Sequence, residues 1–241
     1  MAPPVLLLVH GAWHGAWCWA PLQAELDSRG IASHAIDMPG HGASPLPLTD
    51  MYGDARAVAD AATAVGGSVI LVGHSYGGVV ISEAAHLLAG REEVSVAHMV
   101  YVAAFCLDAG ESTGSFLASQ EDRTTLLNSA MIPRDDGTVV LEPATAARAL
   151  YNCMSDRQIE AALPRLTPQP RITLGQPVSS APWREIPSTY VVCEQDLSVN
   201  PVHQRVMAAR CGDVRSLDTD HSPFASMPTQ TADILEGIVR H

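Results

Sequence analysis

The sequence contains no lysine: arginine supplies all 14 basic side chains, against 26 acidic ones, and the formal net charge is −12. Schiff-base chemistry and any other mechanism that needs a lysine ammonium are therefore excluded. There is also no basic tract, which makes nucleic acids and anionic membrane surfaces poor partners for this chain. We expect it to bind neither.

Long apolar runs are absent as well. The longest, Val94 to Leu107, is interrupted by Ser95 and His98, and it falls short of the roughly 20 residues that a membrane helix needs. Met1 to Val9 has no positive charge ahead of its short apolar run, so we expect no signal peptide. Together these absences predict a soluble, cytoplasmic protein.

Cysteine is sparse and scattered. The five residues form no C-x-x-C pair, and they stand at Cys18, Cys106, Cys153, Cys193 and Cys211. An odd, unclustered set indicates buried thiols in a reducing compartment and argues against a disulfide framework or a zinc site.

What is present favours one globular α/β domain. Of the 241 residues, 47% are hydrophobic and 17% are charged, which is typical of a folded chain with a sizeable core. Apolar runs alternate with helical periods, and this alternation predicts a right-handed, mostly parallel sheet with helices on both faces. The expected strands are Val5–Val9, Ile31–Ile36, a run from Val69, Val96–Val102, Thr189–Val192 and Val214–Leu217, and the expected helices are Trp17–Ser28, Tyr52–Val65, Gly77–Ala89, Pro201–Arg210 and Thr229–Val239.

The alternation stops over residues 106–186. The Asp-Gly pair within Arg134–Thr138 favours a tight hairpin turn. Two short helices, Ala144–Tyr151 and Asp156–Leu163, are expected to follow it. We interpret residues 106–186 as a cap inserted between sheet strands of a single domain that spans residues 1–241.

The best-defined motif is Gly73-His74-Ser75-Tyr76-Gly77, which follows an apolar run and precedes a helical period. A strand, a tight turn over one serine and a helix form a nucleophile elbow, in which the serine has a strained backbone. Gly73 and Gly77 remove the collisions that larger residues would make in so tight a turn. We predict that Ser75 is a nucleophile.

A serine nucleophile needs a base that a carboxylate orients, and in an elbow protein the partners follow in the order serine, acid, histidine. His221 follows the last expected strand, where the base belongs, and the other nine histidines are interpreted as packed, turn or surface residues. Asp196 ends the preceding strand and is the expected acid, with Asp108 as the alternative. A helix-capping carboxylate is the other interpretation of Asp196.

Two backbone N–H groups are expected to hold the oxyanion. One belongs to Tyr76, directly after the serine, and the other to the loop after the first strand, where we choose Ala12. Removing one such donor typically costs about 3 kcal/mol of barrier. Trp13, Phe105 and Leu107 are the candidate substrate-binding residues, with core packing as the alternative for the tryptophan and the phenylalanine.

Four segments resemble one branch of the α/β-hydrolases: His10–Trp19, Asp37–Ser44, Gly73–Gly78 and Asp220–His221. The branch contains plant methylesterases, α-hydroxynitrile lyases and similar bacterial carboxylesterases. The resemblance covers nearly the whole sheet domain and is weaker in the expected cap.

This resemblance implies the α/β-hydrolase fold. It also implies that Ser75, Asp196 and His221 form the catalytic triad and that Ala12 and Tyr76 form the oxyanion hole. It implies neither a metal nor an organic cofactor.

The resemblance also helps to choose among the activities of the branch. Hydroxynitrile lyases of this branch carry a lysine after the histidine and a threonine in the oxyanion loop, where this chain has Ser222 and Ala12. Because the cap has no dense basic cluster, we expect a serine carboxylesterase for small, uncharged, fairly apolar esters. The alternatives are a small-molecule receptor that hydrolyses slowly or not at all, a hydroxynitrile lyase, which the absence of lysine disfavours, and amide, C–C or perhydrolytic chemistry at the same site.

Overall fold

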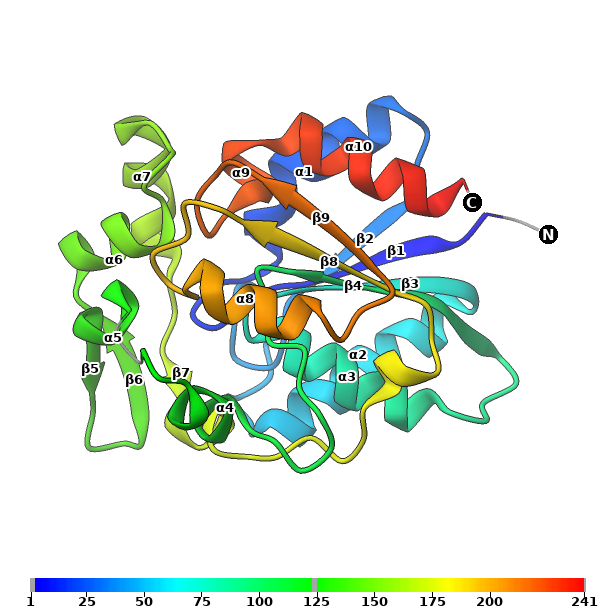
Figure 1. Ribbon diagram of the computed structural model, residues 1–241, viewed down its shortest axis with the longest axis horizontal. Coiled ribbons are helices and arrows are strands. Elements are labelled where there is room, and N and C mark those ends of the chain that lie inside the picture. The colour runs from blue at the N-terminus through cyan, green and yellow to red at the C-terminus, as the bar shows by residue number, and fades with distance from the viewer. Residues whose placement is uncertain (1–2, 123–124, 241) are drawn as a thin grey trace.

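A parallel six-stranded sheet forms the centre of the computed structural model, which describes residues 3–122 and 125–240 (Figure 1). The strands are β1 (Val5–Val9), β2 (Ser33–Ile36), β3 (Gly67–His74), β4 (Val94–Val102), β8 (Ser188–Cys193) and β9 (Asp213–Leu217). They lie in the order β2-β1-β3-β4-β8-β9, and each neighbouring pair is parallel. The predicted α/β class is confirmed.

Helices cover both faces of this sheet (Figure 1). One face carries α1 (Ala20–Ser28), α10 (Pro228–Val239) and two short elements, η1 (Ala16–Trp19) and α9 (Pro223–Ser226). The other face carries α2 (Met51–Val65), α3 (Gly77–Leu88) and α8 (Pro201–Ala208). Within the described residues, no helix has both the length and the apolar character needed to cross a membrane.

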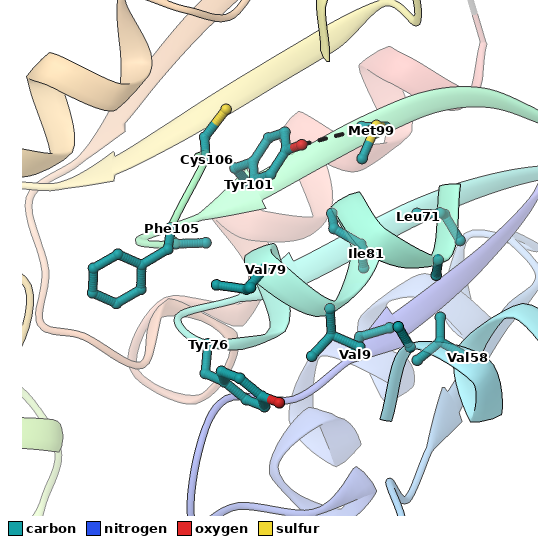
Figure 2. Packing of buried hydrophobic residues seen from close by; sticks show 14 of the residues in the cluster. Val9, Val58, Leu71, Tyr76, Val79, Ile81, Met99, Tyr101, Phe105 and Cys106 are labelled. Carbon is teal, nitrogen blue, oxygen red and sulfur yellow. Dashed lines mark hydrogen bonds between the residues drawn. The ribbon is translucent and has the colours of Figure 1, made fainter. Parts of the chain in front are cut away.

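The strand β1 shows how the sheet divides the core in two. Leu6 and Leu8 pack into the cluster that includes α1 and α10, whereas Leu7 and Val9 pack into the cluster that includes α2 and α3. All four side chains are fully buried, which explains why the strand reads as a continuous apolar run. Figure 2 shows the larger cluster from close by, with side chains of the sheet facing those of α2 and α3.

The chain leaves the sheet between β4 and β8, and residues 103–187 are called the inserted segment below. It contains α4 (Thr113–Ser119), α5 (Leu126–Ala130), β5 (Met131–Pro133), β6 (Thr138–Leu141), α6 (Pro143–Leu150), α7 (Asp156–Ala162), η2 (Leu163–Arg165), β7 (Gln169–Pro170), η3 (Arg171–Leu174) and η4 (Pro182–Arg184). The strands β5, β6 and β7 form a small antiparallel sheet. Most of these elements lie beyond the arrow ends of β8 and β9 (Figure 1). That residues 106–186 act as a cap stays a prediction.

Short elements are where the sequence prediction fell short. The hairpin turn is confirmed, with Gly137 at a φ of 82° between β5 and β6. The elements α4, α5, β7 and α9 were not predicted, because two to seven residues are too few to show a hydrophobic period. The helix α8 also ends at Ala208 rather than Arg210.

Candidate active site

Ser75 lies in the turn between β3 and α3, with a φ of 53°. This left-handed conformation is uncommon outside glycine and strained for a serine. The surrounding backbone holds it in place: the Ser75 N–H donates to the carbonyl of Val102 (3.2 Å), and its own carbonyl accepts from the N–H groups of Gly78 (3.0 Å) and Phe105 (3.1 Å). The Ser75 residue is only 7% exposed.

The glycines beside Ser75 have the steric role that the motif predicts. A Cβ atom on Gly73 would lie 2.6 Å from the carbonyl oxygen of Gly77, and one on Gly77 would lie 2.5 Å from the carbonyl oxygen of Val9. Both neighbours are backbone atoms of packed elements, so neither can yield. The turn therefore requires glycine at both positions.

His221 and Asp196 meet at the carboxyl edge of the sheet. His221 follows β9 and Asp196 follows β8, and the His221 Nδ1 donates to the Asp196 Oδ2 at 2.7 Å. Both residues are buried. Because Nδ1 is used in this bond, only Nε2 of His221 remains to accept a proton.

Asp196 is held by more than the histidine. Its Oδ1 accepts from the N–H groups of Ser198 (2.7 Å) and Val199 (2.9 Å), and its Oδ2 also accepts from Gln204 Nε2 (2.7 Å). Gln204 is fully buried on α8, and its Oε1 accepts from the Cys193 N–H at 2.9 Å. Gln204 was not predicted as a site residue, because a single glutamine in a helix usually lies on the surface.

Asp108, the alternative acid, lies elsewhere. It forms an ion pair with Arg184, and its side chain is 36% exposed. The Arg184 guanidinium lowers the pKa of Asp108 below its usual range. The carboxylate that is hydrogen-bonded to His221 is therefore Asp196 and not Asp108.

His74 brings the loop of His221 against the elbow. Its Nε2 donates to the carbonyl oxygen of His221 at 2.8 Å, and the two rings lie 4.5 Å apart between centroids. Burial lowers the pKa of His74 well below its usual value, so the ring is neutral and its proton stays on Nε2. Since His74 directly precedes Ser75, this contact places the His221 loop beside the serine.

Ala12 and Tyr76 line the same cavity as Ser75. Gly11 lies so close to the elbow that a Cβ atom on it would be 2.9 Å from Ser75 Cβ. In the described part of the chain, the backbone N–H groups of Ala12 and Tyr76 donate no hydrogen bond, although both residues are buried. Buried N–H groups nearly always have a partner, so this pair is available to a ligand oxygen.

The loop that carries Ala12 is attached to the inserted segment through Trp13. Trp13 has a φ of 65°, its indole N–H donates to the Val139 carbonyl at 2.9 Å, and its own carbonyl accepts from the Thr167 N–H at 2.8 Å. These bonds hold a backbone conformation that is strained for a tryptophan.

Tyr76 is anchored by a buried acid on α2. Its hydroxyl donates to the Asp54 Oδ2 at 2.8 Å. Burial raises the pKa of the Asp54 carboxyl to about 7, and Asp54 Oδ1 has no hydrogen-bond partner among the described residues. The pair was not expected from the sequence, because Asp54 lies in an ordinary helical period.

A cavity of about 130 Å³ lies beside Ser75. Among the described residues, none with a charged side chain lines it; the lining residues are Ala12, Trp13, Ser75, Tyr76, Phe105, Thr113, Gly114, Leu117, Thr125, Leu127, Asn128, Met131, Leu174, Ser198 and Val199. The inserted segment supplies many of them. Over residues 3–122 and 125–240, no group of three or more His, Cys, Asp or Glu side chains is placed to hold a metal ion.

Only two of the three predicted substrate-binding residues line this cavity. Trp13 and Phe105 line it, but Leu107 does not. Phe105 and Cys106 point in different directions (Figure 2), and Leu107 packs into the core, fully buried, while its carbonyl accepts from the Trp183 indole N–H at 2.8 Å. The prediction for Leu107 is corrected because the chain has already turned into the core at that point.

Comparison with known proteins gives consistent results. A model of the alpha/beta hydrolase family matches residues 6–234. The alpha/beta hydrolase nvfD of Aspergillus novofumigatus is 32% identical over 239 residues, which cover 95% of this chain and 93% of the relative. Methylesterase 7 of Arabidopsis thaliana is 28% identical over 247 residues, which cover 95% of this chain and 94% of the relative.

A solved structure agrees over nearly the whole length. The pyrethroid hydrolase from Sphingobium faniae JZ-2 superposes with a TM-score of 0.84 at 25% sequence identity, and the match covers 98% of this chain and 97% of that one. This similarity extends through the inserted segment as well as the sheet.

Proposed function

Because the chain belongs to the alpha/beta hydrolase family, in the branch of the plant methylesterases, we propose that it is a serine carboxylesterase for small, uncharged, fairly apolar esters. Its relatives are named as hydrolases and esterases, which supports ester hydrolysis in general. One observation carries the finer proposal: Ser75 lines an apolar cavity together with Ala12 and Tyr76, whose buried backbone N–H groups have no partner among the described residues.

In the proposed reaction, the Ser75 hydroxyl attacks the ester carbonyl while His221 Nε2 accepts the hydroxyl proton. Asp196 holds the ring through Nδ1 and stabilises its positive charge. The negative charge that develops on the carbonyl oxygen is bound by the N–H groups of Ala12 and Tyr76. His221 then returns the proton to the leaving alcohol, and a water molecule releases the acid from Ser75 by the same steps.

The size and the apolar lining of the cavity limit which substrate group can enter it. An apolar cavity of about 150 Å³ holds one benzene molecule, so a cavity of about 130 Å³ suits a group of similar or smaller size. A charged group would lose its hydration there and gain no countercharge from the described residues that line the cavity. We propose that one side of the ester, uncharged and with up to about six carbon atoms, occupies this cavity.

Hydrolysis of p-nitrophenyl butyrate tests this function. We expect turnover by the wild type, and a loss of about 10³-fold or more in Ser75→Ala and His221→Ala. His86→Ala, at an exposed position on α3, is the matched control and should keep wild-type activity. Turnover that survives in Ser75→Ala, or cyanide release from mandelonitrile without ester turnover, would contradict the proposal.

A further inference from the structure

We propose that His14 is a positioning residue for the oxyanion site: it holds the backbone at Ala12 and connects it to Tyr151 of the inserted segment. This inference rests on the proposed function, because it takes the Ala12 N–H as an oxyanion donor. Neither His14 nor Tyr151 has a part in the reaction steps described above.

The two ring nitrogens of His14 contact the oxyanion loop on one side and the inserted segment on the other. His14 Nδ1 lies 2.9 Å from the carbonyl oxygen of Ala12, and His14 Nε2 lies 2.8 Å from the hydroxyl oxygen of Tyr151. His14 and Tyr151 are each 1% exposed. Tyr151 directly follows α6, 137 positions away in the sequence, so the bond is a tertiary contact between the loop and the inserted segment.

The chemistry of the partners fixes the state of the ring. A carbonyl oxygen can only accept, so the proton of a neutral His14 lies on Nδ1. Nε2 is then an acceptor, and the Tyr151 hydroxyl must donate to it. Burial lowers the pKa of His14 to about 4, which keeps the ring neutral at physiological pH.

The position of His14 explains how it would orient the backbone N–H of Ala12. The Ala12 N–H belongs to the peptide unit between Gly11 and Ala12, whose carbonyl oxygen accepts from His10 Nδ1 at 2.8 Å and from the His14 N–H at 3.3 Å. The next peptide unit, after Ala12, is held at its carbonyl by the His14 ring. Since peptide units are planar, fixing both of them fixes the direction of the Ala12 N–H.

A donor that is aimed before the reaction adds no reorganisation cost when the negative charge develops. Loss of the bond from His14 to the Ala12 carbonyl should therefore reduce stabilisation of the transition state and leave binding of the ground-state substrate unchanged. Trp13, between Ala12 and His14, also donates to the inserted segment through its indole. The position of the inserted segment is thereby coupled to the oxyanion site.

Two substitutions at His14 separate its two bonds. The amide nitrogen of asparagine reaches about as far as Nδ1, and that of glutamine about as far as Nε2. His14→Asn can keep the bond to the Ala12 carbonyl and lose Tyr151, whereas His14→Gln can keep the bond to Tyr151 and lose Ala12. Tyr151→Phe removes only the hydroxyl that donates to His14 Nε2, so it tests the same bond as His14→Asn from the tyrosine.

We expect kcat for p-nitrophenyl butyrate to fall about tenfold in His14→Gln, with KM within about twofold. His14→Asn and Tyr151→Phe should each lose less than His14→Gln. A trifluoromethyl ketone, which forms an oxyanion adduct with a serine, should bind His14→Gln about tenfold more weakly, while the matching methyl ketone binds as to the wild type. A purely structural role would change the binding of both ketones together.

A nitrogen NMR spectrum of the histidines gives a readout that does not depend on activity. The wild type should show His14 as the neutral Nδ1–H tautomer, and the signal should change in Tyr151→Phe. Equal kcat in wild type, His14→Asn and His14→Gln, or an Nε2–H tautomer, would overturn this inference and leave the proposed function standing. A wild type that hydrolyses no ester would overturn the proposed function, and with it this role of His14.

Discussion

Among the described residues, four groups donate hydrogen bonds to Asp196, and the bond from Gln204 gives that residue a role that no motif indicated. The amide donates to the same oxygen that His221 uses, so it helps to fix the direction of the carboxylate. Its own carbonyl is held by the Cys193 N–H on β8. Gln204 is therefore a positioning residue that acts through Asp196.

Replacing Gln204 by leucine should lower kcat for p-nitrophenyl butyrate. The substitution removes the amide that donates to Asp196 Oδ2, so the carboxylate holds the His221 ring less firmly. We expect kcat to fall about tenfold, with KM within about twofold. Gln230→Leu, at an exposed position on α10, is the control, and equal kcat in both variants would contradict this role.

Asp54 is expected to make stability depend on pH. Burial raises the pKa of its carboxyl from 3.8 to about 7, so the folded state holds a proton that the unfolded state releases. Stability from this group is present below the unfolded pKa and is lost as the pH rises through the folded pKa. Asp54→Asn mimics the protonated acid and removes this loss.

Urea unfolding at a series of pH values measures the effect. The unfolding free energy of Asp54→Asn relative to the wild type should rise between about pH 4 and pH 7, by at most about 4 kcal/mol. Asp60→Asn, at an exposed position of α2, controls for the loss of one negative charge. A difference that stays constant over this range would show that Asp54 is ionised without penalty.

At the scale of elements, the join between β3 and α3 leaves no room for a larger residue. Gly77→Ala would place a Cβ atom 2.5 Å from the Val9 carbonyl oxygen and 2.7 Å from that of His10. We expect a loss of about 2–4 kcal/mol in stability and reduced ester hydrolysis, because Ser75 must shift.

Gly237→Ala on α10 is the contrasting variant. Its added Cβ atom meets nothing within 4 Å, so removing a helical glycine should raise stability by about 0.5–1 kcal/mol. Urea unfolding followed by circular dichroism measures both variants. If Gly77→Ala were as stable as Gly237→Ala, the steric account of the elbow would be wrong.

The elements differ in how far the sequence predicts them. The central strands and the elbow were predicted because buried apolar runs and the spacing of Gly73 and Gly77 act within a few residues of the chain. The contacts of the inserted segment were not, because they join distant positions, such as Trp13 to Val139 and His14 to Tyr151. The placing of Leu107 failed for the same reason, since its direction depends on how the inserted segment packs.

At the scale of the whole molecule, the net charge of −12 should select against anionic substrates. A negatively charged ester is repelled by the overall field, and the repulsion is screened by salt. We expect kcat/KM for a succinate half-ester to be below that of its neutral methyl diester, and the gap to narrow as ionic strength rises. A gap that does not respond to salt would assign the preference to the cavity wall alone.

The central claim is that one serine oxygen is activated, and covalent labelling tests it most directly. Folded protein is treated with a fluorophosphonate, and intact mass and peptide mapping locate the adduct. The account predicts one label, on Ser75, and none in Ser75→Ala. A label on any other residue, or no label on folded wild-type protein, would contradict it.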